Sequence, residues 1–251
     1  MRKSILTLGI AAVLTGVLAT CSMAYAADDE LAQIQESGKL KVGVEGTYPP
    51  YTYHDDNGEL TGFDVEVAKA IADKLGAEAD FTESDWDSLL AGIDSGRLDT
   101  VINAVSITPE REEKYDFAGP YFYITQQIVV AKDNDDIVDM ASLNGKKVAN
   151  TATTAYLDIL EDAGASLVQI STADEAVSLI ESGRADFTTF NSVVFNEYLQ
   201  QHPDANLKVA FVIPDVVDTY AVPIKKGETA LYDAVQNAID AVSYTHLRAH
   251  E

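Results

Sequence analysis

The sequence predicts an α/β protein of two lobes, each a sheet flanked by helices, with a two-strand hinge joining them. Three observations support this fold class. Strand-like and helix-like segments alternate along the chain, a helix–glycine–strand segment occurs twice, and an apolar run lies on each side of its second copy. The alternation predicts parallel sheets covered by helices, and the repeat predicts two units of similar construction.

The first half of the chain shows the alternation most clearly. Leu40–Glu45 has the pattern of a strand, and Phe63–Leu75 that of an amphipathic helix. A short strand over Ala79–Phe81, a helix over Trp86–Ile93 and a strand over Leu98–Asn103 follow. This order predicts βαβ units, and therefore a parallel sheet with helices on its faces.

The repeat places two asparagines at equivalent positions. Residues 93–99 (Ile-Asp-Ser-Gly-Arg-Leu-Asp) recur as residues 180–186 (Ile-Glu-Ser-Gly-Arg-Ala-Asp). Each copy has the pattern of a helix end, a glycine cap and the start of a strand. The two predicted strands end at Asn103 and Asn191. Because open α/β sheets bind ligands beyond the carboxyl ends of their strands, we expect a cleft with these asparagines on opposite walls.

Two apolar runs, Gln127–Ala131 and Tyr220–Ile224, are suited to crossing between the lobes. They could equally be ordinary sheet strands, and the two interpretations are compatible. With the crossing interpretation, lobe 1 consists of residues 27–131 and 221–242, and lobe 2 of residues 132–220. Lobe 1 is then discontinuous in sequence.

The N-terminus has the pattern of a secretory signal peptide over residues 1–26. A basic start is followed by an apolar run, Ile5–Thr20, and by Ala24-Tyr25-Ala26, whose small residues suit signal peptidase. An alternative is a lipoprotein signal with Cys21 as the lipid acceptor. We favour cleavage after Ala26, which predicts export to the periplasm.

Cleavage there changes which chemistry is available. It removes the single cysteine, so the mature chain has no disulfide, thiol nucleophile or cysteine metal ligand. It leaves 15 basic against 41 acidic residues, a net charge of −26. Such a surface repels nucleic acid and anionic lipid, and no later apolar stretch is long enough to span a membrane. We therefore expect neither nucleic-acid nor lipid binding.

Signals for catalysis are weak. The four histidines have no metal-ligand spacing, and there is no Gly-x-Ser-x-Gly elbow and no phosphate-binding glycine loop. The abundant paired carboxylates are typical of solvated faces in so acidic a chain. We expect no catalytic residues, no metal and no cofactor.

Arg111 is the arginine best placed to bind an anion. Of the others, Arg2 lies in the signal, Arg97 and Arg184 lie at helix ends, and Arg248 lies close to the C-terminus. Arg111 follows the strand that ends at Asn103, on a short helix that Thr108 can cap with Pro109 at its first position. A surface ion pair with Glu112 or Glu113 is the alternative. The position beyond a strand end favours carboxylate binding.

Further candidate site residues follow other predicted strands. Glu45 and Tyr48 lie at the end of the first strand. Trp86 begins a helix between two aspartates, although a core role is equally open for a tryptophan. Residues 150–154, which include Thr151, Thr153 and Thr154, follow a strand over Lys147–Ala149 and are expected to open a helix. A helix N-terminus there would offer anion-binding N–H groups from the second lobe.

The chain resembles the periplasmic solute-binding proteins for polar amino acids, which are partners of ABC importers and have the type II periplasmic-binding-protein fold. Residues 62–75 (Gly-Phe-Asp-Val-Glu-Val-Ala-Lys-Ala-Ile-Ala-Asp-Lys-Leu) satisfy the signature of that family. The likeness continues through Ser106–Arg111, Lys114–Phe117 and Leu143–Val148, and covers roughly residues 30–242. Residues 45–50, Trp86-Asp87 and Val101-Ile102-Asn103 are most similar to cystine-binding members.

The resemblance implies a function and a set of contacts. It implies a monomeric protein that captures an amino acid, here L-cystine, and delivers it to an ABC transporter permease. Tyr48 and Trp86 would be aromatic platforms, backbone at Ala104 with Ser106 would bind an α-group, and Arg111 would clamp the carboxylate. Thr153 and Thr154 would bind from lobe 2. The full expected set is Glu45, Tyr48, Trp86, Asn103, Ala104, Ser106, Arg111, Thr151, Thr153, Thr154 and Asn191.

The sequence departs from the family pattern at three places. Asn191 stands where an aspartate usually holds the α-ammonium, and Thr153 replaces a glycine. After Val242 the family continues with a further helix, whereas residues 243–251 read as a non-native tail. The alternatives to cystine are glutamine, histidine or another polar amino acid. From other classes we consider a cyclohexadienyl-dehydratase-like enzyme, with Glu45 as acid–base, and a receptor sensor domain.

Overall fold

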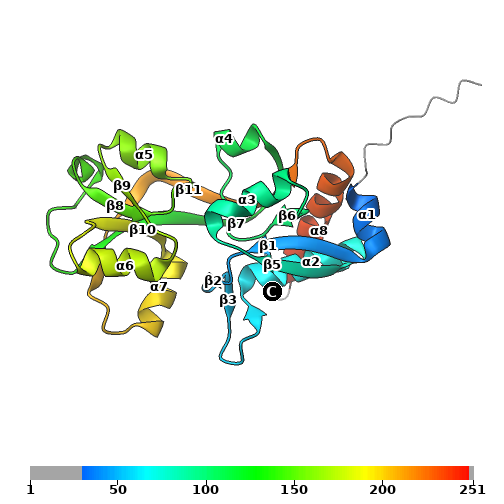
Figure 1. Cartoon of the computed structure of the whole chain (residues 1–251), viewed down its shortest axis with the longest axis horizontal. Coiled ribbons are helices and arrows are strands. Elements are labelled where there is room, and N and C mark those ends of the chain that lie inside the picture. The colour runs from blue at the N-terminus through cyan, green and yellow to red at the C-terminus, as the bar shows by residue number, and fades with distance from the viewer. Residues whose placement is uncertain (1–29, 249–251) are drawn as a thin grey trace, which may run out of the picture.

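The computed structural model describes residues 30–248. The expected signal peptide with Cys21, and residues 249–251 of the expected tail, lie outside this range. Eight strands form one continuous sheet in the order β5-β1-β6-β11-β7-β10-β8-β9, and three more form a small second sheet. The molecule is elongated, with a group of helices at each end and two long strands between them (Figure 1). The predicted two-lobed α/β fold is confirmed, with the two lobe sheets joined through the long strands.

Lobe 1 holds the predicted parallel sheet. Its strands are β1 (Lys39–Val44), β5 (Glu78–Glu83) and β6 (Thr100–Val101), with the small sheet of β2 (Thr47–Tyr48), β3 (Thr52–His54) and β4 (Leu60–Thr61). Its helices are α1 (Glu30–Ser37), α2 (Phe63–Leu75), α3 (Trp86–Asp94), α4 (Pro109–Glu112) and α8 (Thr229–Arg248). The strand expected over 98–103 is shorter, at Thr100–Val101, although the N–H groups of Asp99 and Ile102 on either side of it still donate to carbonyls of β1.

Lobe 2 repeats the arrangement with three parallel strands, β8 (Lys147–Asn150), β9 (Ser166–Gln169) and β10 (Phe187–Asn191). Its helices are α5 (Leu157–Asp162), α6 (Ala173–Glu181) and α7 (Ser192–Gln201), with a short 3₁₀ helix, η1 (Met140–Leu143). Helix α5 lies on one side of the sheet, and α6 and α7 lie on the other (Figure 1).

The sequence repeat forms the same structure in both lobes. Gly96 and Gly183 follow the ends of α3 and α6 with φ of +70° and +68°, a conformation that favours glycine. The carboxylate of Asp99 accepts a hydrogen bond from the backbone N–H of Lys41 at 2.7 Å. In lobe 2, Asp186 accepts from Lys147 in the same way, also at 2.7 Å. The repeated residues therefore join each helix–glycine turn to the first strand of its own lobe.

The hinge is formed by β7 (Tyr115–Ala131) and β11 (Leu207–Lys225), which pair antiparallel along most of their length. One end of the pair lies beside β6 of lobe 1, through β11, and the other beside β10 of lobe 2, through β7. The predicted crossing segments 127–131 and 220–224 are the opposite ends of this ribbon. The crossing itself lies between them, where Val217–Thr219 pairs with Tyr123–Thr125.

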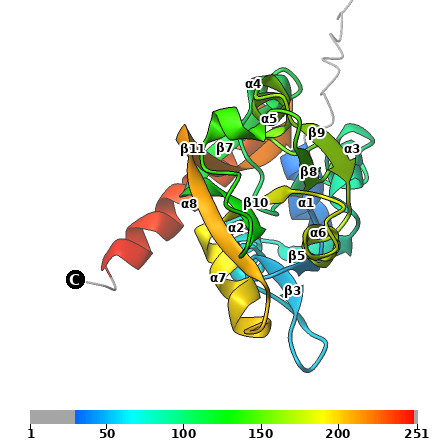
Figure 2. The same ribbon diagram turned by 90° about the vertical axis from the view of Figure 1, so that its left-hand side faces the viewer.

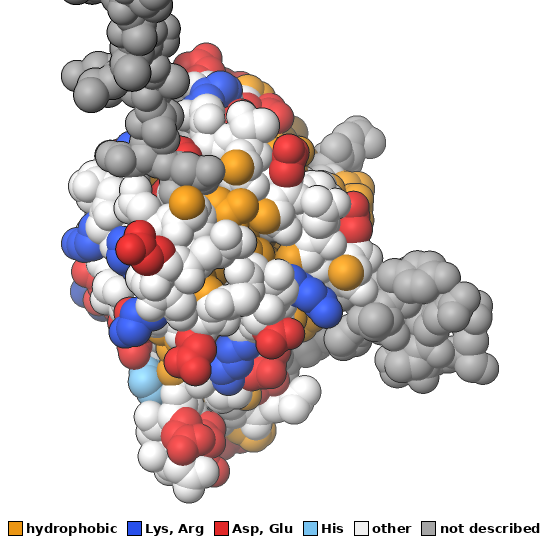
Figure 3. All heavy atoms as spheres, turned by 90° about the vertical axis from the view of Figure 1, so that its right-hand side faces the viewer, with side chains coloured by type: hydrophobic (Ala, Val, Ile, Leu, Met, Phe, Trp, Pro, Cys, Tyr) orange, Lys and Arg blue, Asp and Glu red, His pale blue; other side chains and the backbone are white. Residues whose placement is uncertain are grey.

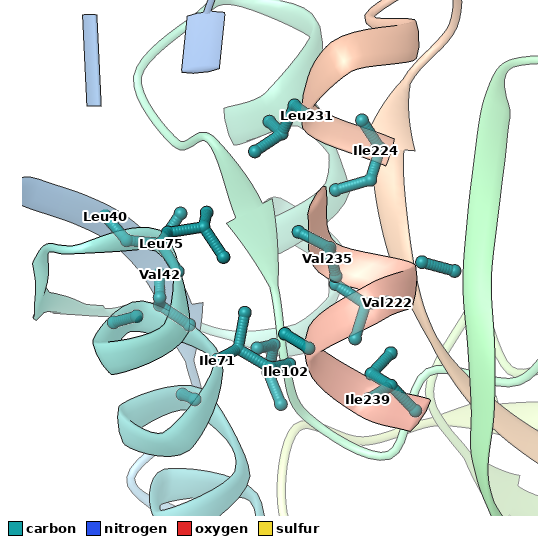
Figure 4. Packing of buried hydrophobic residues seen from close by; sticks show 14 of the residues in the cluster. Leu40, Val42, Ile71, Leu75, Ile102, Val222, Ile224, Leu231, Val235 and Ile239 are labelled. Carbon is teal, nitrogen blue, oxygen red and sulfur yellow. The ribbon is translucent and has the colours of Figure 1, made fainter. Parts of the chain in front are cut away.

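The core of lobe 1 brings together residues from both ends of the described chain. Leu40 and Val42 of β1 and Ile71 of α2 pack against Val222 of β11 and Val235 of α8 (Figure 4). These five side chains are almost fully buried. Burial of apolar surface on this scale is the main stabilising contribution, so the C-terminal strand and helix belong structurally to lobe 1.

The C-terminal helix and the outer surface add two observations. Helix α8 continues to Arg248, so residues 243–248 of the expected tail form its last turns, which project from the molecule (Figure 2). At the lobe 1 end, acidic and basic side chains are interspersed on the surface (Figure 3). Within residues 30–248, no helix has both the length and the apolarity to cross a membrane.

Candidate functional site

One cavity lies where the two lobes and the hinge meet, and most of the predicted site residues line it. Glu45, Tyr48, Trp86 and the segment around Asn103 come from lobe 1, and the threonines come from lobe 2. Nine of the eleven expected residues face this cavity: Glu45, Tyr48, Trp86, Asn103, Ala104, Ser106, Arg111, Thr151 and Thr154. The carboxyl ends of the strands therefore meet where the sequence analysis expected a cleft.

Asn191 is placed differently from the expectation. Its side chain is buried and does not line the cavity. The amide oxygen accepts from the N–H of Val194 at 2.9 Å and so caps α7, while the amide nitrogen donates to the hydroxyl of Tyr220 at 2.9 Å. Both functions of the amide are used inside the protein, so Asn191 supports the cavity from behind.

Residues 151–156 form turns, and α5 begins only at Leu157, so the expected helix opening at 150–154 is wrong. Threonine is a poor helix former because its branched side chain is restricted against the preceding turn. The side chain of Thr153 points toward lobe 1 instead of lining the cavity, and its hydroxyl donates to Asp87 at 2.6 Å.

Several lining residues were not predicted. Gln126 and Tyr220 belong to the hinge strands, and Tyr156 ends the turns of lobe 2 just before α5. From the sequence, the hinge strands were expected only to connect the lobes. Alternation of side chains along a strand would have indicated that some hinge residues must face the cleft.

Asn103 fixes the position of Glu45. Its amide oxygen accepts from the backbone N–H of Glu45 at 2.9 Å and from the hydroxyl of Thr52 at 2.7 Å. Its amide nitrogen donates to the Glu45 carboxylate at 2.7 Å. The asparagine thus holds both the backbone and the side chain of a carboxyl group that lines the cavity.

Burial alters the acidity of that carboxyl group. Desolvation, together with the nearby charges of Asp85 and Asp87, raises the pKa of Glu45 from 4.5 to about 7. The hydrogen bond from Asn103 acts in the opposite direction. A group with this pKa can be neutral or charged near neutral pH.

Arg111 joins the two lobes at the cavity. Thr108 caps α4 by accepting from the Arg111 N–H at 3.2 Å, with Pro109 at the start of the helix, so the predicted local structure is confirmed. The guanidinium donates to the carbonyl of Ser106 at 2.8 Å and to the carbonyl of Thr153 in lobe 2 at 2.7 Å. Since a guanidinium has five N–H groups, donors remain for an anion. Arg111 is 8 % exposed, and burial lowers the pKa of its guanidinium.

Aromatic rings form the rest of the lobe 1 wall and the base of the cavity. The guanidinium of Arg111 lies 5.3 Å from the ring centre of Trp86, within cation–π range. Trp86 also packs beside the buried cluster that contains Leu89, so the core and cavity roles considered for it are combined. Tyr48 packs on Tyr51 at 5.4 Å between ring centres.

The backbone at Ala104 is held by a buried carboxyl group. The N–H of Ala104 donates to Asp64 of α2 at 2.6 Å, and Ala104 has a positive φ that side-chain-bearing residues rarely adopt. Burial raises the pKa of Asp64 to about 7. Asp64 belongs to the segment 62–75, so that segment orients part of the cavity wall.

A second contact joins the lobes at the cavity rim. Asp87 of α3 accepts from the hydroxyl and backbone N–H of Thr153, at 2.6 and 3.2 Å. It also accepts from the amide of Gln169, at the end of β9, at 3.2 Å. With the Arg111–Thr153 bond, this contact holds lobe 1 against lobe 2 beside the cavity.

These features define a class of protein. Two α/β lobes on a two-strand hinge enclose a cavity that combines a guanidinium, a carboxyl group and aromatic rings, which suits a small polar solute carrying charges of both signs. Residues 40–247 match the sequence profile of the bacterial extracellular solute-binding proteins, family 3. The chain belongs to this family.

Relatives in the family are binding proteins for amino-acid transport. The "L-cystine-binding protein TcyA" of Bacillus subtilis is 38% identical over 248 residues, covering 95% of this chain and 91% of the relative. The "Probable amino-acid ABC transporter-binding protein" of Haemophilus influenzae is 35% identical over 243 residues, with 96% and 92% covered. The solved structure of an amino acid ABC transporter substrate-binding protein of Streptococcus pneumoniae bound to L-arginine has 28% identity and a TM-score of 0.79, covering 86% of this chain and 93% of that one.

The raised pKa of Glu45 predicts a pH-dependent stability. Between pH 4.5 and about 7 the folded protein keeps a proton that the unfolded chain has lost, so stability falls as the pH rises through this window. Glu45→Gln should lose less thermal stability over the same range in calorimetry. Asp64 keeps part of the slope in the variant, because its pKa is raised in the same direction. Glu110→Gln, at an exposed site, should follow the unchanged protein; a parallel slope in Glu45→Gln would contradict the prediction.

The Asp87 contacts predict a shift in how often the lobes are joined. Asp87→Ala removes the acceptor of the bonds from Thr153 and Gln169, and an exposed hydrogen bond contributes about 0.5–1.5 kcal/mol. The equilibrium between joined and separated lobes should therefore move roughly two- to tenfold toward separation. Small-angle scattering should show a larger radius of gyration. Asp85→Ala is the matched control, because it removes the same charge next to α3 from a side chain that makes no cap hydrogen bond.

Proposed function

We propose that the protein captures a polar amino acid, L-cystine, in the periplasm and delivers it to an ABC transporter permease. The main support is that the guanidinium of Arg111 donates hydrogen bonds to carbonyl groups of both lobes at the edge of the cavity. A carboxylate bound there would contact lobe 1 while lying against lobe 2. Binding would therefore favour the joined arrangement of the lobes, without any bond being made or broken in the ligand.

Arg111 would bind one carboxylate of the ligand, and the aromatic side chains of Tyr48 and Trp86 would lie against its body. Arg111, Trp86 and Tyr48 line the same cavity, and the guanidinium already packs on the indole. Charge-assisted bidentate hydrogen bonds are the strongest contacts available to a carboxylate. The threonines of residues 151–154 would add contacts from lobe 2, with Thr153 acting through its contacts to Asp87 and Arg111.

Cystine is proposed above other amino acids for two reasons. The resemblance of residues 45–50 and of Trp86-Asp87 is to cystine-binding proteins, and a relative of 38% identity is named as one. Cystine carries two carboxylates and two ammonium groups, and the cavity is lined by the carboxyl group of Glu45 as well as by Arg111. Glutamine, histidine and other polar amino acids are the alternatives that the test must separate.

A thermal-shift screen of the twenty amino acids plus L-cystine tests this function. A ligand present at a hundred times its dissociation constant should raise the free energy of unfolding by about 2.7 kcal/mol. We expect the largest shift with cystine. A larger shift with another amino acid would replace cystine as the ligand. Prephenate is included as a separate arm, because its conversion to an aromatic product would contradict a pure binding function and indicate an enzyme.

Arg111→Ala should weaken cystine binding at least tenfold in titration calorimetry. Truncating one partner of a buried charge pair costs about 2–5 kcal/mol, which corresponds to more than tenfold. Arg97→Ala, at the helix end after α3, is the control and should bind as the unchanged protein does. An unchanged affinity in Arg111→Ala would remove this residue from the ligand contacts.

A further inference from the structure

Asp218 is a buried acidic residue at the centre of the hinge that the sequence analysis did not consider. It lies on β11 where this strand pairs with Ile124 of β7, and it is 6 % exposed. Side chains two residues apart on a strand point to the same face. Asp218 therefore points to the same side as Tyr220, which lines the cavity.

Three parts of the molecule donate hydrogen bonds to one oxygen of Asp218. Ser106 of lobe 1 donates its hydroxyl at 3.0 Å, and Gln126 of β7 donates its amide at 3.2 Å. Tyr156 of lobe 2 donates its hydroxyl to the same oxygen. All three donors line the cavity. The carboxylate of Asp218 is thus held by lobe 1, by the hinge and by lobe 2 directly behind the cavity wall.

None of these partners carries a charge. Among the ion pairs of the described side chains, none involves Asp218. A buried carboxylate is unfavourable unless a cation or several hydrogen bonds compensate it, and only hydrogen bonds to one oxygen do so here. Arg111 is near enough to interact electrostatically with this carboxylate but makes no ion pair with it.

Ser106 links this carboxylate to Arg111. Its carbonyl accepts from the Arg111 guanidinium at 2.8 Å, while its hydroxyl donates to Asp218. An isolated antiparallel bridge between Ser106 and Tyr220 fixes this residue beside β11. A positive and a negative group therefore flank a single cavity-lining residue. The α-carboxylate and α-ammonium of an amino acid are separated by one carbon atom, so they match this arrangement.

The other acidic and polar candidates fit an ammonium group less well. Asn191, like Asp218, is not among the lining residues, but it is neutral and both of its amide functions are in use. Glu45 is bound by Asn103, which in turn belongs to a different set of hydrogen bonds from Ser106 and Arg111. Glu45 lines the cavity but has no hydrogen-bond partner in common with Arg111. It therefore suits a second ammonium group, or the side chain of the ligand, at a distance from the carboxylate that Arg111 binds.

We propose that Asp218 is the anionic partner of the ammonium group next to the carboxylate that Arg111 binds. This inference rests on the proposed amino-acid function and extends it. The charge that selects an α-amino group comes from the hinge strand β11, in place of the strand end at Asn191. Because Ser106, Gln126 and Tyr156 all hold the same carboxylate, the ammonium group would be bound at the point where both lobes and the hinge meet.

A pair of ligands that differ only in their ammonium groups tests the proposal. L-Cystine is compared with 3,3′-dithiodipropionic acid, which has the same carboxylates and disulfide and no amino groups. In calorimetry, Asp218→Asn should weaken cystine binding at least tenfold and change the affinity for the diacid by less than threefold. Arg111→Ala should weaken both ligands, and Glu45→Gln should reduce cystine binding less than Asp218→Asn does.

The outcomes separate this proposal from the proposed function. If the unchanged protein binds no amino acid, the function itself fails. If it binds cystine and Asp218→Asn weakens both ligands equally, or neither, then Asp218 does not bind the ammonium and the inference is overturned. Thermal unfolding of each variant checks folding. Should Asp218→Asn not fold, Asp218→Ser removes the charge in a smaller side chain and must show the same selective loss.

Discussion

The antiparallel pairing of β7 with β11 is the constraint on which the rest of the structure depends. Each strand runs from one lobe into the other, so a single ribbon sets the distance and direction between two otherwise separate sheets. The hinge therefore forms part of the site. Gln126 and Tyr220 of this ribbon line the cavity, and Asp218 lies behind it and accepts a hydrogen bond from Gln126. Any change in the angle between the lobes moves lobe residues relative to these three side chains.

Charge is distributed very unevenly around this ribbon. The chain has a net charge of −24, and the cavity nevertheless contains a buried guanidinium. Burial disfavours that charge and lowers the pKa of Arg111, while Tyr156 and Asp218 act in the opposite direction. The acidic exterior repels anions in general. A molecule that carries both charges avoids this repulsion and can still offer a carboxylate to Arg111, which favours a zwitterion over a simple anion.

Local patterns in the sequence predicted what depends on local structure. The bounds of α2, the cap of α4 by Thr108 and the glycine turns at 96 and 183 follow from periodicity and capping. The turns at 151–156 were missed because a strand end followed by small polar residues was taken for a helix start. The role of Asp218 could not be predicted, because it follows from the register between β11 and the segment after β6, which joins residues more than a hundred positions apart. Asn191 was assigned to the cleft, although an asparagine directly before a helix is also a typical N-cap, which is the role it has.

The contacts between the lobes also affect how strongly a ligand binds and how far it can shift the equilibrium between joined and separated lobes. Asp87, Thr153 and Arg111 hold the lobes together through groups that belong to the protein alone. Such contacts raise the population of the joined form before a ligand arrives, so less binding energy is spent on closing the lobes. The same contacts reduce the difference in lobe arrangement between the free and the occupied protein. A ligand can shift the equilibrium between separated and joined lobes only as far as its affinities for the two forms differ. The rim contacts at Asp87 are few and exposed, so they assist closure without making the joined form dominant. The ligand's interactions with the buried charges of Arg111 and Asp218 then account for most of the shift toward the joined lobes.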